Sequence, residues 1–327
     1  MQQFSADVAR LDRDGFVVLD GILPPTDVEQ ARQELARLFE DDVQTRKANG
    51  VTEAYQPGGP VGATILTAPS HLALDVYNKS PAFDRMLEQM LTDPRVRNIV
   101  KSWSGEDFRI GSCNIRYMTG AIDPPPAHEL HRDGPYSMNL CIMLTDVEPG
   151  ENAATAMVPG SQTSTVDPRW DTLFETPFRL TKDPARSGLN VFLRWNIFNN
   201  IFRAKSFRKV TGAFGKQGDV YFFPNGEVWH GRLPNMHGRR TMICLMGCTT
   251  VTAENATRPS SVPGEVLAKL PPTLKKHLAG PFQPNDMTNT IVERIYKTRK
   301  PASVFSLEYW SKLERRLAEW ITERVAA

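Results

Sequence analysis

The sequence predicts a mainly β protein with flanking helices, built around an antiparallel barrel or jelly roll. Three observations lead to this prediction. Short apolar runs separated by Gly and Pro clusters fill residues 108–250. Residues 1–107 carry apolar stripes at helical spacing, and so do residues 251–327. A chain of 327 residues allows one large domain or two. We expect one domain in these three parts, because the helical stripes need a partner surface.

The first part is expected to contain a strand and two helices. The apolar run Phe16–Leu19 follows the turn pair Asp14-Gly15. Residues 26–29 match a capping box, and the apolar residues after it repeat at helical spacing. A second helix is expected around residues 81–91. The Gly- and Pro-rich loop 56–62 lacks the ending of a phosphate-binding loop, and we interpret it as a mobile edge or part of an active-site lid.

The middle part supplies the strands of the predicted barrel. The runs with the clearest strand character are Gly111–Met118, Met138–Leu144, Ala153–Val158, Val220–Phe223 and Thr241–Gly247. Turn residues separate these runs, which is typical of antiparallel sheets.

Residues 165–210 interrupt the strand pattern with a long insertion. Nine basic and four acidic residues lie in it, among many aromatic residues that include Trp195. In one interpretation the segment is a lid whose aromatic residues pack in its core and whose charges are solvated. In the other it is a pocket wall that attracts an anionic substrate.

The C-terminal part predicts helices at residues 263–270 and 272–279, and a longer helix at residues 306–321. The last has a continuous apolar face. That face docks on the barrel in one interpretation and joins two copies of the chain in the other, so a monomer and a homodimer both stay open.

Charge and composition favour a small-molecule partner. Lys and Arg total 39 against 37 for Asp and Glu, which gives no electrostatic footprint for nucleic acid or membranes. The four cysteines lie in apolar runs and are expected to be reduced. The N-terminus lacks the features of a signal peptide, and no apolar run is long enough to span a membrane. We therefore expect a cytoplasmic protein.

The triplet His131-Arg132-Asp133 is the main candidate for chemistry. Residues two apart on a strand point to the same side, so His131 and Asp133 can address one metal ion, and His230 can join them from another strand. Two imidazoles and one carboxylate form the ligand set of a non-haem iron(II) site with open positions. No carboxylate lies two residues after His128, which we expect at the mouth of the site.

Four further residues are candidates for binding an oxygen-activating co-substrate. Arg239 and Arg240 lead into the run 241–247, where an inward guanidinium would bind a distal carboxylate; ordinary turn charges are the alternative. Asn114 and Arg116 share one face of an expected strand, where contact with co-substrate or substrate and a plain strand-surface role both stay open.

Two tryptophans, Trp229 and Trp195, are candidate substrate contacts. Trp229 lies next to His230, where it would form a wall of the pocket. Core packing is the alternative interpretation for both residues.

These residues together resemble the phytanoyl-CoA dioxygenase family of iron(II)- and 2-oxoglutarate-dependent oxygenases. The resemblance covers roughly residues 10–250, with five elements in the family's order: residues 14–18, 131–133, 158–161, 218–231 and 238–240. It implies that His131, Asp133 and His230 bind iron and that Arg240 binds 2-oxoglutarate. Arg239 stays an alternative, because the interval from His230 to Arg240 is one residue shorter than usual. Arg232 stands where a small hydroxyl residue often assists the arginine.

The resemblance also implies a double-stranded β-helix, or cupin-like, core and a reaction that uses Fe(II), 2-oxoglutarate and O2. Conversion of 2-oxoglutarate to succinate and CO2 would accompany hydroxylation, desaturation or ring formation at an unactivated C–H bond. The carboxylate of Asp133 argues against halogenation, which in related enzymes needs a small residue there. The alternative is a non-oxidative jelly roll, either a cupin-type metal-dependent isomerase or a metabolite-binding module.

Overall fold

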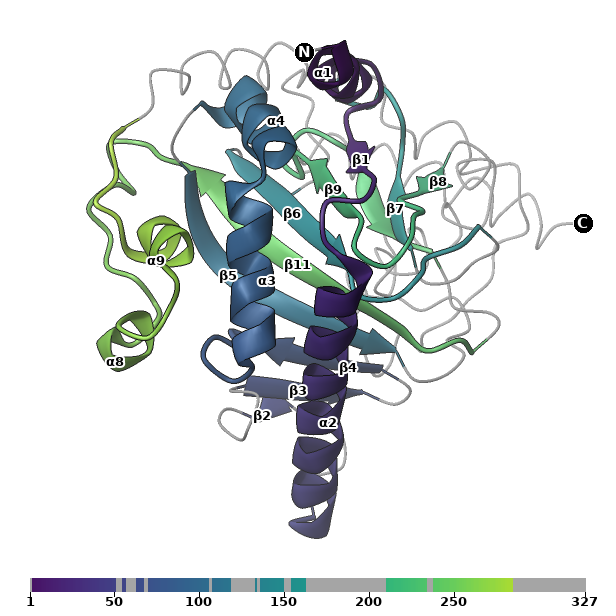
Figure 1. The fold of residues 1–327 in the computed structure, drawn as a ribbon, viewed down its shortest axis with the longest axis vertical. Coiled ribbons are helices and arrows are strands. Elements are labelled where there is room, and N and C mark those ends of the chain that lie inside the picture. Colours follow the sequence, from purple (N-terminus) through teal and green to yellow (C-terminus); the bar gives the residue numbers. More distant parts are fainter. Residues whose placement is uncertain are drawn as a thin grey trace, which may run out of the picture.

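Two antiparallel sheets form the centre of the protein (Figure 1). The computed structural model describes residues 2–50, 55–56, 63–67, 70–105, 108–118, 133, 136–149, 154–162, 210–233 and 238–284. Within these residues the large sheet has the order β1-β9-β6-β11-β5-β4-β3-β2, and the small sheet has the order β10-β7-β8. The strands are β1 (Val17–Leu19), β2 (Tyr55–Gln56), β3 (Ala63–Thr67), β4 (Ser70–Leu74), β5 (Phe108–Met118), β6 (Ser137–Met143), β7 (Thr155–Met157), β8 (Thr211–Gly212), β9 (Val220–Phe223), β10 (His230–Arg232) and β11 (Thr241–Thr250).

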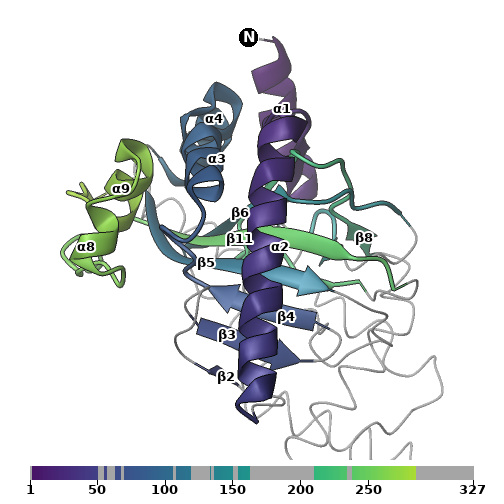
Figure 2. The same ribbon diagram turned by 60° about the horizontal axis from the view of Figure 1, so that its bottom comes forward.

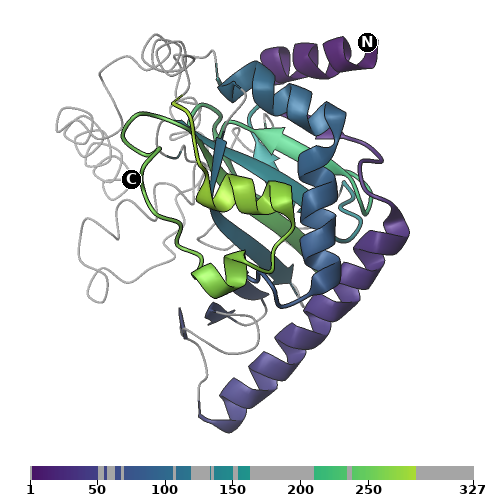
Figure 3. The ribbon, with the colours of Figure 1, turned by 60° about the vertical axis from the view of Figure 1, so that its left-hand side comes forward.

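Helices cover one face of the large sheet (Figures 1 and 2). They pack on it through a core of buried apolar side chains from both layers, such as Phe39, Met86 and Leu140. Helix α9 lies against β5 and α3 (Figure 3). The helices are α1 (Gln2–Asp14), α2 (Pro25–Ala48), α3 (Pro81–Thr92), α4 (Pro94–Ser104), α8 (Gly264–Leu267) and α9 (Pro272–Ala279). In the described part of the chain no helix is long and apolar enough to cross a membrane.

The other face of the large sheet turns toward the small sheet, and a second core lies between them. Alternation along β11 shows the division: Met242, Cys244 and Met246 face the helices, whereas Ile243 and Leu245 face the small sheet. A jelly roll has this arrangement of two sheets around an interior.

A bulge in β5 changes which residues face each side. Gly247 of β11 is paired with Ser112 and Cys248 with Ile110, so Gly111 is the extra residue. Ile110 and Cys113 both face the helices as a result. Ser112 and the alternate residues after it then face the small sheet.

The mainly β fold and its barrel strands are confirmed, and so are the helices expected around residues 81–91 and at 272–279. Helix α2 differs at its start: it begins at Pro25, and its cap residue Pro24 makes no side-chain hydrogen bond, so the expected capping box does not form. The strands β2–β4 and the helices α1 and α4 were not expected. The insertion 165–210 and the helix expected at 306–321 lie largely or wholly outside the described residues.

The turn before β9 is closed by Gly218 and Asp219. The Asp219 carboxylate accepts the backbone N–H groups of Lys216 at 2.7 Å and Gly21 at 2.8 Å. Gly218 has φ +94°, and a Cβ atom there would lie 2.5 Å from the carbonyl oxygen of Leu23. Only glycine fits this position, because any side chain would strain the left-handed backbone and would also clash with the Leu23 carbonyl.

Replacing Gly218 with alanine is expected to lower the free energy of unfolding by about 2–4 kcal/mol, from left-handed strain and the clash together. Gly21→Ala is the matched control, since Gly21 also has a positive φ but nothing lies within 4 Å of its Cβ position. That variant should lose about 1–2 kcal/mol. Urea unfolding measures both, and equal losses would contradict the role of close approach.

Candidate active site

A cavity of about 320 Å³ opens between the two sheets. Strands β5, β6 and β11 of the large sheet form one wall, and β7 and β10 of the small sheet contribute to the other. Its lining is rich in polar side chains: Ser112, Asn114, Arg116, Asp133, Asn139, Thr155, Asn225, His230 and Arg232. Such a concave site with several convergent polar groups is suited to bind a small molecule.

Asp133 and His230 meet at the wall of this cavity. The Oδ2 atom of Asp133 lies 3.6 Å from Nε2 of His230. Two atoms that each bind one ion at about 2.1 Å lie roughly 3–4 Å apart, so this separation suits two ligands of one metal. The His230 side chain is 7% exposed and that of Asp133 is 41% exposed. The carboxylate therefore lies on the more open side of the pair.

The segment between β9 and β10 orients both side chains. The Nδ1 atom of His230 lies 3.0 Å from the carbonyl oxygen of Val228, which can only accept a hydrogen bond, so Nδ1 carries the proton. Nε2, the nitrogen toward Asp133, is then the one with the lone pair. On the same segment, the carbonyl oxygen of Asn225 accepts the backbone N–H of Asp133 at 2.9 Å, and its side-chain amide donates to Asp133 Oδ2 at 2.5 Å.

Two neighbouring elements hold this segment in place. The backbone N–H of Val158 donates to the carbonyl of Trp229, and that of Trp229 donates to the Ser161 hydroxyl, both at 2.9 Å. From α4, the indole N–H of Trp103 donates to the buried Glu227 carboxylate at 3.1 Å. Sequence reasoning treated Val158–Ser161 only as a strand end and family element, and it missed the positioning roles of Asn225 and Trp103.

Three sequence-predicted site residues, His128, His131 and Trp195, lie outside the described residues. In the described part of the chain, no third His, Cys, Asp or Glu joins Asp133 and His230 in a metal-binding cluster. Trp229 is buried in the core between the sheets and does not line the cavity.

The structure brings Asn114 and Arg116 into the cavity, together with Arg232. Burial lowers the pKa of Arg116, and burial together with the positive charge of Arg116 lowers the pKa of Arg232 to about 9. Both guanidinium groups remain charged at neutral pH. The Nε atoms of both arginines and Oδ1 of Asn114 are buried without a hydrogen-bond partner among the described residues.

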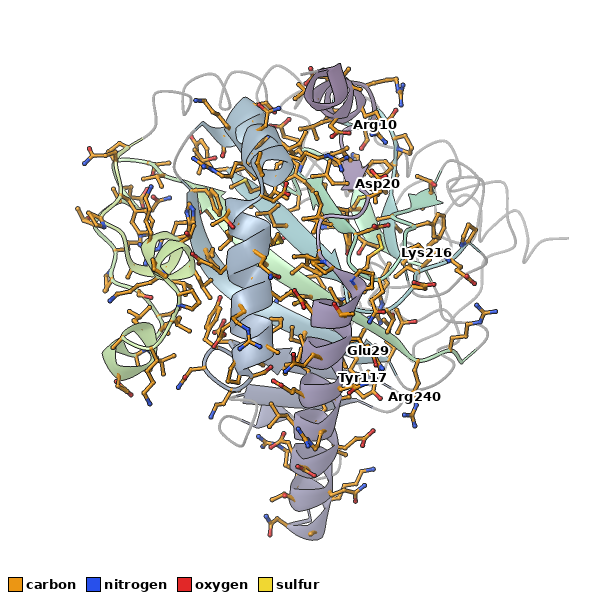
Figure 4. All side chains as sticks on the ribbon, in the orientation of Figure 1. Arg10, Asp20, Glu29, Tyr117, Lys216 and Arg240 are labelled. Carbon is orange, nitrogen blue, oxygen red and sulfur yellow. The ribbon has the colours of Figure 1, made fainter. Side chains whose placement is uncertain are left out.

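Arg239 and Arg240, by contrast, lie outside the cavity, contrary to the sequence prediction. Arg239 is 61% exposed and donates to Glu148 at 2.7 Å. Arg240 is 71% exposed and lies beside α2, 3.9 Å from Glu40 (Figure 4). Both residues precede β11, which begins at Thr241, and their guanidinium groups lie beside exposed carboxylates instead of the cavity.

The fold is a jelly roll, and its cavity places a histidine imidazole next to a carboxylate. The model of the phytanoyl-CoA dioxygenase (PhyH) family matches residues 11–242, and the chain belongs to that family. No curated protein sequence matches the chain.

Several solved structures are similar to the chain at low identity. HygX from Streptomyces hygroscopicus, with nickel and 2-oxoglutarate bound, is 17% identical with a TM-score of 0.44, over 75% of this chain and 86% of that chain. AviO1 from Streptomyces viridochromogenes Tue57 is 18% identical with a TM-score of 0.44, over 75% and 94%. The carbocyclase SnoK from nogalamycin biosynthesis is 17% identical with a TM-score of 0.42, over 85% and 92%.

Membership in this family makes the chain an iron- and 2-oxoglutarate-dependent enzyme, with Fe(II), 2-oxoglutarate and O2 as its cofactors. The residues present fit these groups. His230 Nε2 and Asp133 Oδ2 are donors that suit a ferrous ion. The guanidinium groups of the cavity, which have no ion-pair partner in the part of the chain that the structure describes, suit an anionic co-substrate.

Asn225→Leu is expected to weaken binding of a divalent metal by about 10-fold or more, because the hydrogen bond that orients Asp133 is lost. Asn139→Leu is the matched control, since Asn139 lines the same cavity from β6 without a described contact to Asp133. Anaerobic calorimetric titration with Fe(II) measures both affinities. Equal affinities for the two variants would contradict a positioning role for Asn225.

Proposed function

We propose that this chain hydroxylates, desaturates or cyclises an unactivated C–H bond of a small-molecule metabolite. In the hydroxylation case, 2-oxoglutarate, O2 and R–H give succinate, CO2 and R–OH. The observation that carries the proposal is the pair Asp133 Oδ2 and His230 Nε2, 3.6 Å apart on the wall of a polar cavity inside a jelly roll.

We propose His131 as the third metal ligand. Its support is the spacing to Asp133, because residues i and i+2 of an extended segment point to the same side. Two imidazoles and one carboxylate would leave positions on the ion for a co-substrate and oxygen, and ferrous iron held there would activate O2, which is the oxidant of the reaction. Asp133 keeps its carboxylate where a halogenating enzyme needs room for halide, which favours C–H oxidation without halide transfer.

The chain's own residues position the reactants and limit access of water. The hydrogen bond from His230 Nδ1 to the Val228 carbonyl and that from Asn225 to Asp133 hold the ligand atoms toward the cavity. Phe223 packs against the imidazole of His230 with ring centroids 5.0 Å apart, giving an apolar side to the metal position. The cavity volume suits small organic molecules.

The reaction class is tested by spectroscopy on the whole chain. Adding Fe(II) and then 2-oxoglutarate without oxygen should produce the weak visible charge-transfer band of a chelated complex. Iron bound firmly with no such band would instead favour a non-oxidative cupin-type isomerase or a metabolite-binding module. A mass-spectrometric screen for oxygen incorporation over a metabolite panel then identifies the substrate.

Asp133→Ala is expected to abolish formation of succinate coupled to product, because the anionic ligand is lost. Asp146→Ala is the control, since this exposed carboxylate pairs with Lys216 outside the cavity. Succinate and product are quantified by mass spectrometry after incubation with the substrate that the screen identifies. Unchanged coupled turnover in Asp133→Ala would refute the proposed metal site.

A further inference from the structure

Two partly buried arginines on opposite walls of the cavity have no anionic partner among the described residues. Arg116 comes from β5 of the large sheet and Arg232 from β10 of the small sheet. Neither guanidinium forms a hydrogen bond or ion pair with any residue that the structure describes. Burying an unpaired charge is costly, and two like charges facing one cavity add to that cost. An anion bound between them would offset both.

The position of this pair relative to the metal ligands suits a short dicarboxylate. Arg232 follows His230 by two residues on β10, so both side chains point toward the cavity, with their Cα atoms about 7 Å apart. A five-carbon 2-oxo acid that contacts the metal at one end reaches this far at its other end.

Strand β11 does not supply the arginine from its cavity-facing side. Thr241 is the residue of β11 that shares the face of Ile243, and Arg240 precedes the strand, with its exposed side chain 3.9 Å from Glu40. Arg116 is paired with Ile243 in the neighbouring strand. Guanidinium groups therefore reach the cavity from β5, next to β11, and from β10 of the small sheet.

We propose that Arg116 and Arg232 together bind the distal carboxylate of 2-oxoglutarate, in place of Arg240. This inference rests on the proposed function, since it assigns the co-substrate's carboxylate to the same cavity. Each guanidinium donates hydrogen bonds to the carboxylate, so the carboxylate accepts hydrogen bonds from one arginine of the large sheet and one of the small sheet. The arrangement selects a dicarboxylic 2-oxo acid over a monocarboxylic one.

The test compares 2-oxoglutarate with 2-oxovalerate, which has the same five carbons but a methyl group in place of the distal carboxylate. Dissociation constants are measured by calorimetry without oxygen, on metal-free and Fe(II)-loaded protein. The unchanged protein should prefer 2-oxoglutarate. In Arg116→Met and in Arg232→Met, affinity for 2-oxoglutarate should fall by roughly 10- to 100-fold, whereas that for 2-oxovalerate stays unchanged.

Arg240→Met and Arg239→Met are the matched controls, and both should keep the preference of the unchanged protein. The proposal is overturned if both Arg116→Met and Arg232→Met still bind 2-oxoglutarate more tightly than 2-oxovalerate. It is also overturned if only one of the two variants loses this preference. A change in 2-oxovalerate affinity equal to that for 2-oxoglutarate also overturns it. Equal affinity of the unchanged protein for 2-oxoglutarate and 2-oxovalerate overturns the proposal as well.

Failure of the proposed function gives a different result. In that case calorimetry would still show 2-oxoglutarate binding that depends on the two arginines, but addition of Fe(II) would produce no charge-transfer band.

A purely structural role of the arginines is tested by thermal unfolding of the ligand-free variants. Because methionine removes an unpaired buried charge, the unfolding temperature should stay equal or rise. Arg232→Lys is the second variant; it keeps the charge without the planar donor pair, and its preference for 2-oxoglutarate should be reduced.

Discussion

The crossover from β9 to β10 is the constraint on which the site depends. This short segment leaves the large sheet after Phe223 and enters the small sheet at His230. Along the way its backbone carbonyls bind the N–H of Asp133 and the Nδ1–H of His230. One segment thus sets the position of a carboxylate and the tautomer of an imidazole. Val158 and Ser161 after β7 and Trp103 of α4 hold the segment from two other elements, so the geometry of the two side chains depends on the packing of strands and helices around them.

The sequence predicted the parts of the fold in which alternation or helical spacing is strong. Strand β9 and helix α9 have the expected bounds, because their apolar runs are flanked by turn residues or proline. The hairpin β3–β4 was missed, since it widens the sheet at an edge where the Gly- and Pro-rich loop 56–62 dominated the interpretation. The expected capping box failed for a local reason: helix α2 starts at Pro25, two residues earlier than a cap at Thr26 requires.

Within the site, sequence spacing predicted which residues come together better than it predicted the direction in which a side chain points. Asp133 and His230 were expected to meet, and they do, because a jelly roll brings distant strands together. Arg240 was expected to point inward, but it precedes the first residue of β11 and its side chain is exposed beside Glu40 of helix α2. Arg232 was noted only as a departure from the family's pattern. Its burial beside Arg116 is a property of two facing sheets, which a linear spacing does not contain.

The bulge at Gly111 decides that Arg116 faces the cavity at all. Phe108 and Ile110 of β5 point toward the helices, and unbroken alternation would send residues 112, 114 and 116 the same way. The extra residue reverses the alternation, so Ser112, Asn114 and Arg116 line the cavity instead. Without it a guanidinium would be buried in the apolar layer beneath the helices, at a prohibitive cost. The bulge therefore links a single backbone irregularity in the large sheet to the positive charge of the interior.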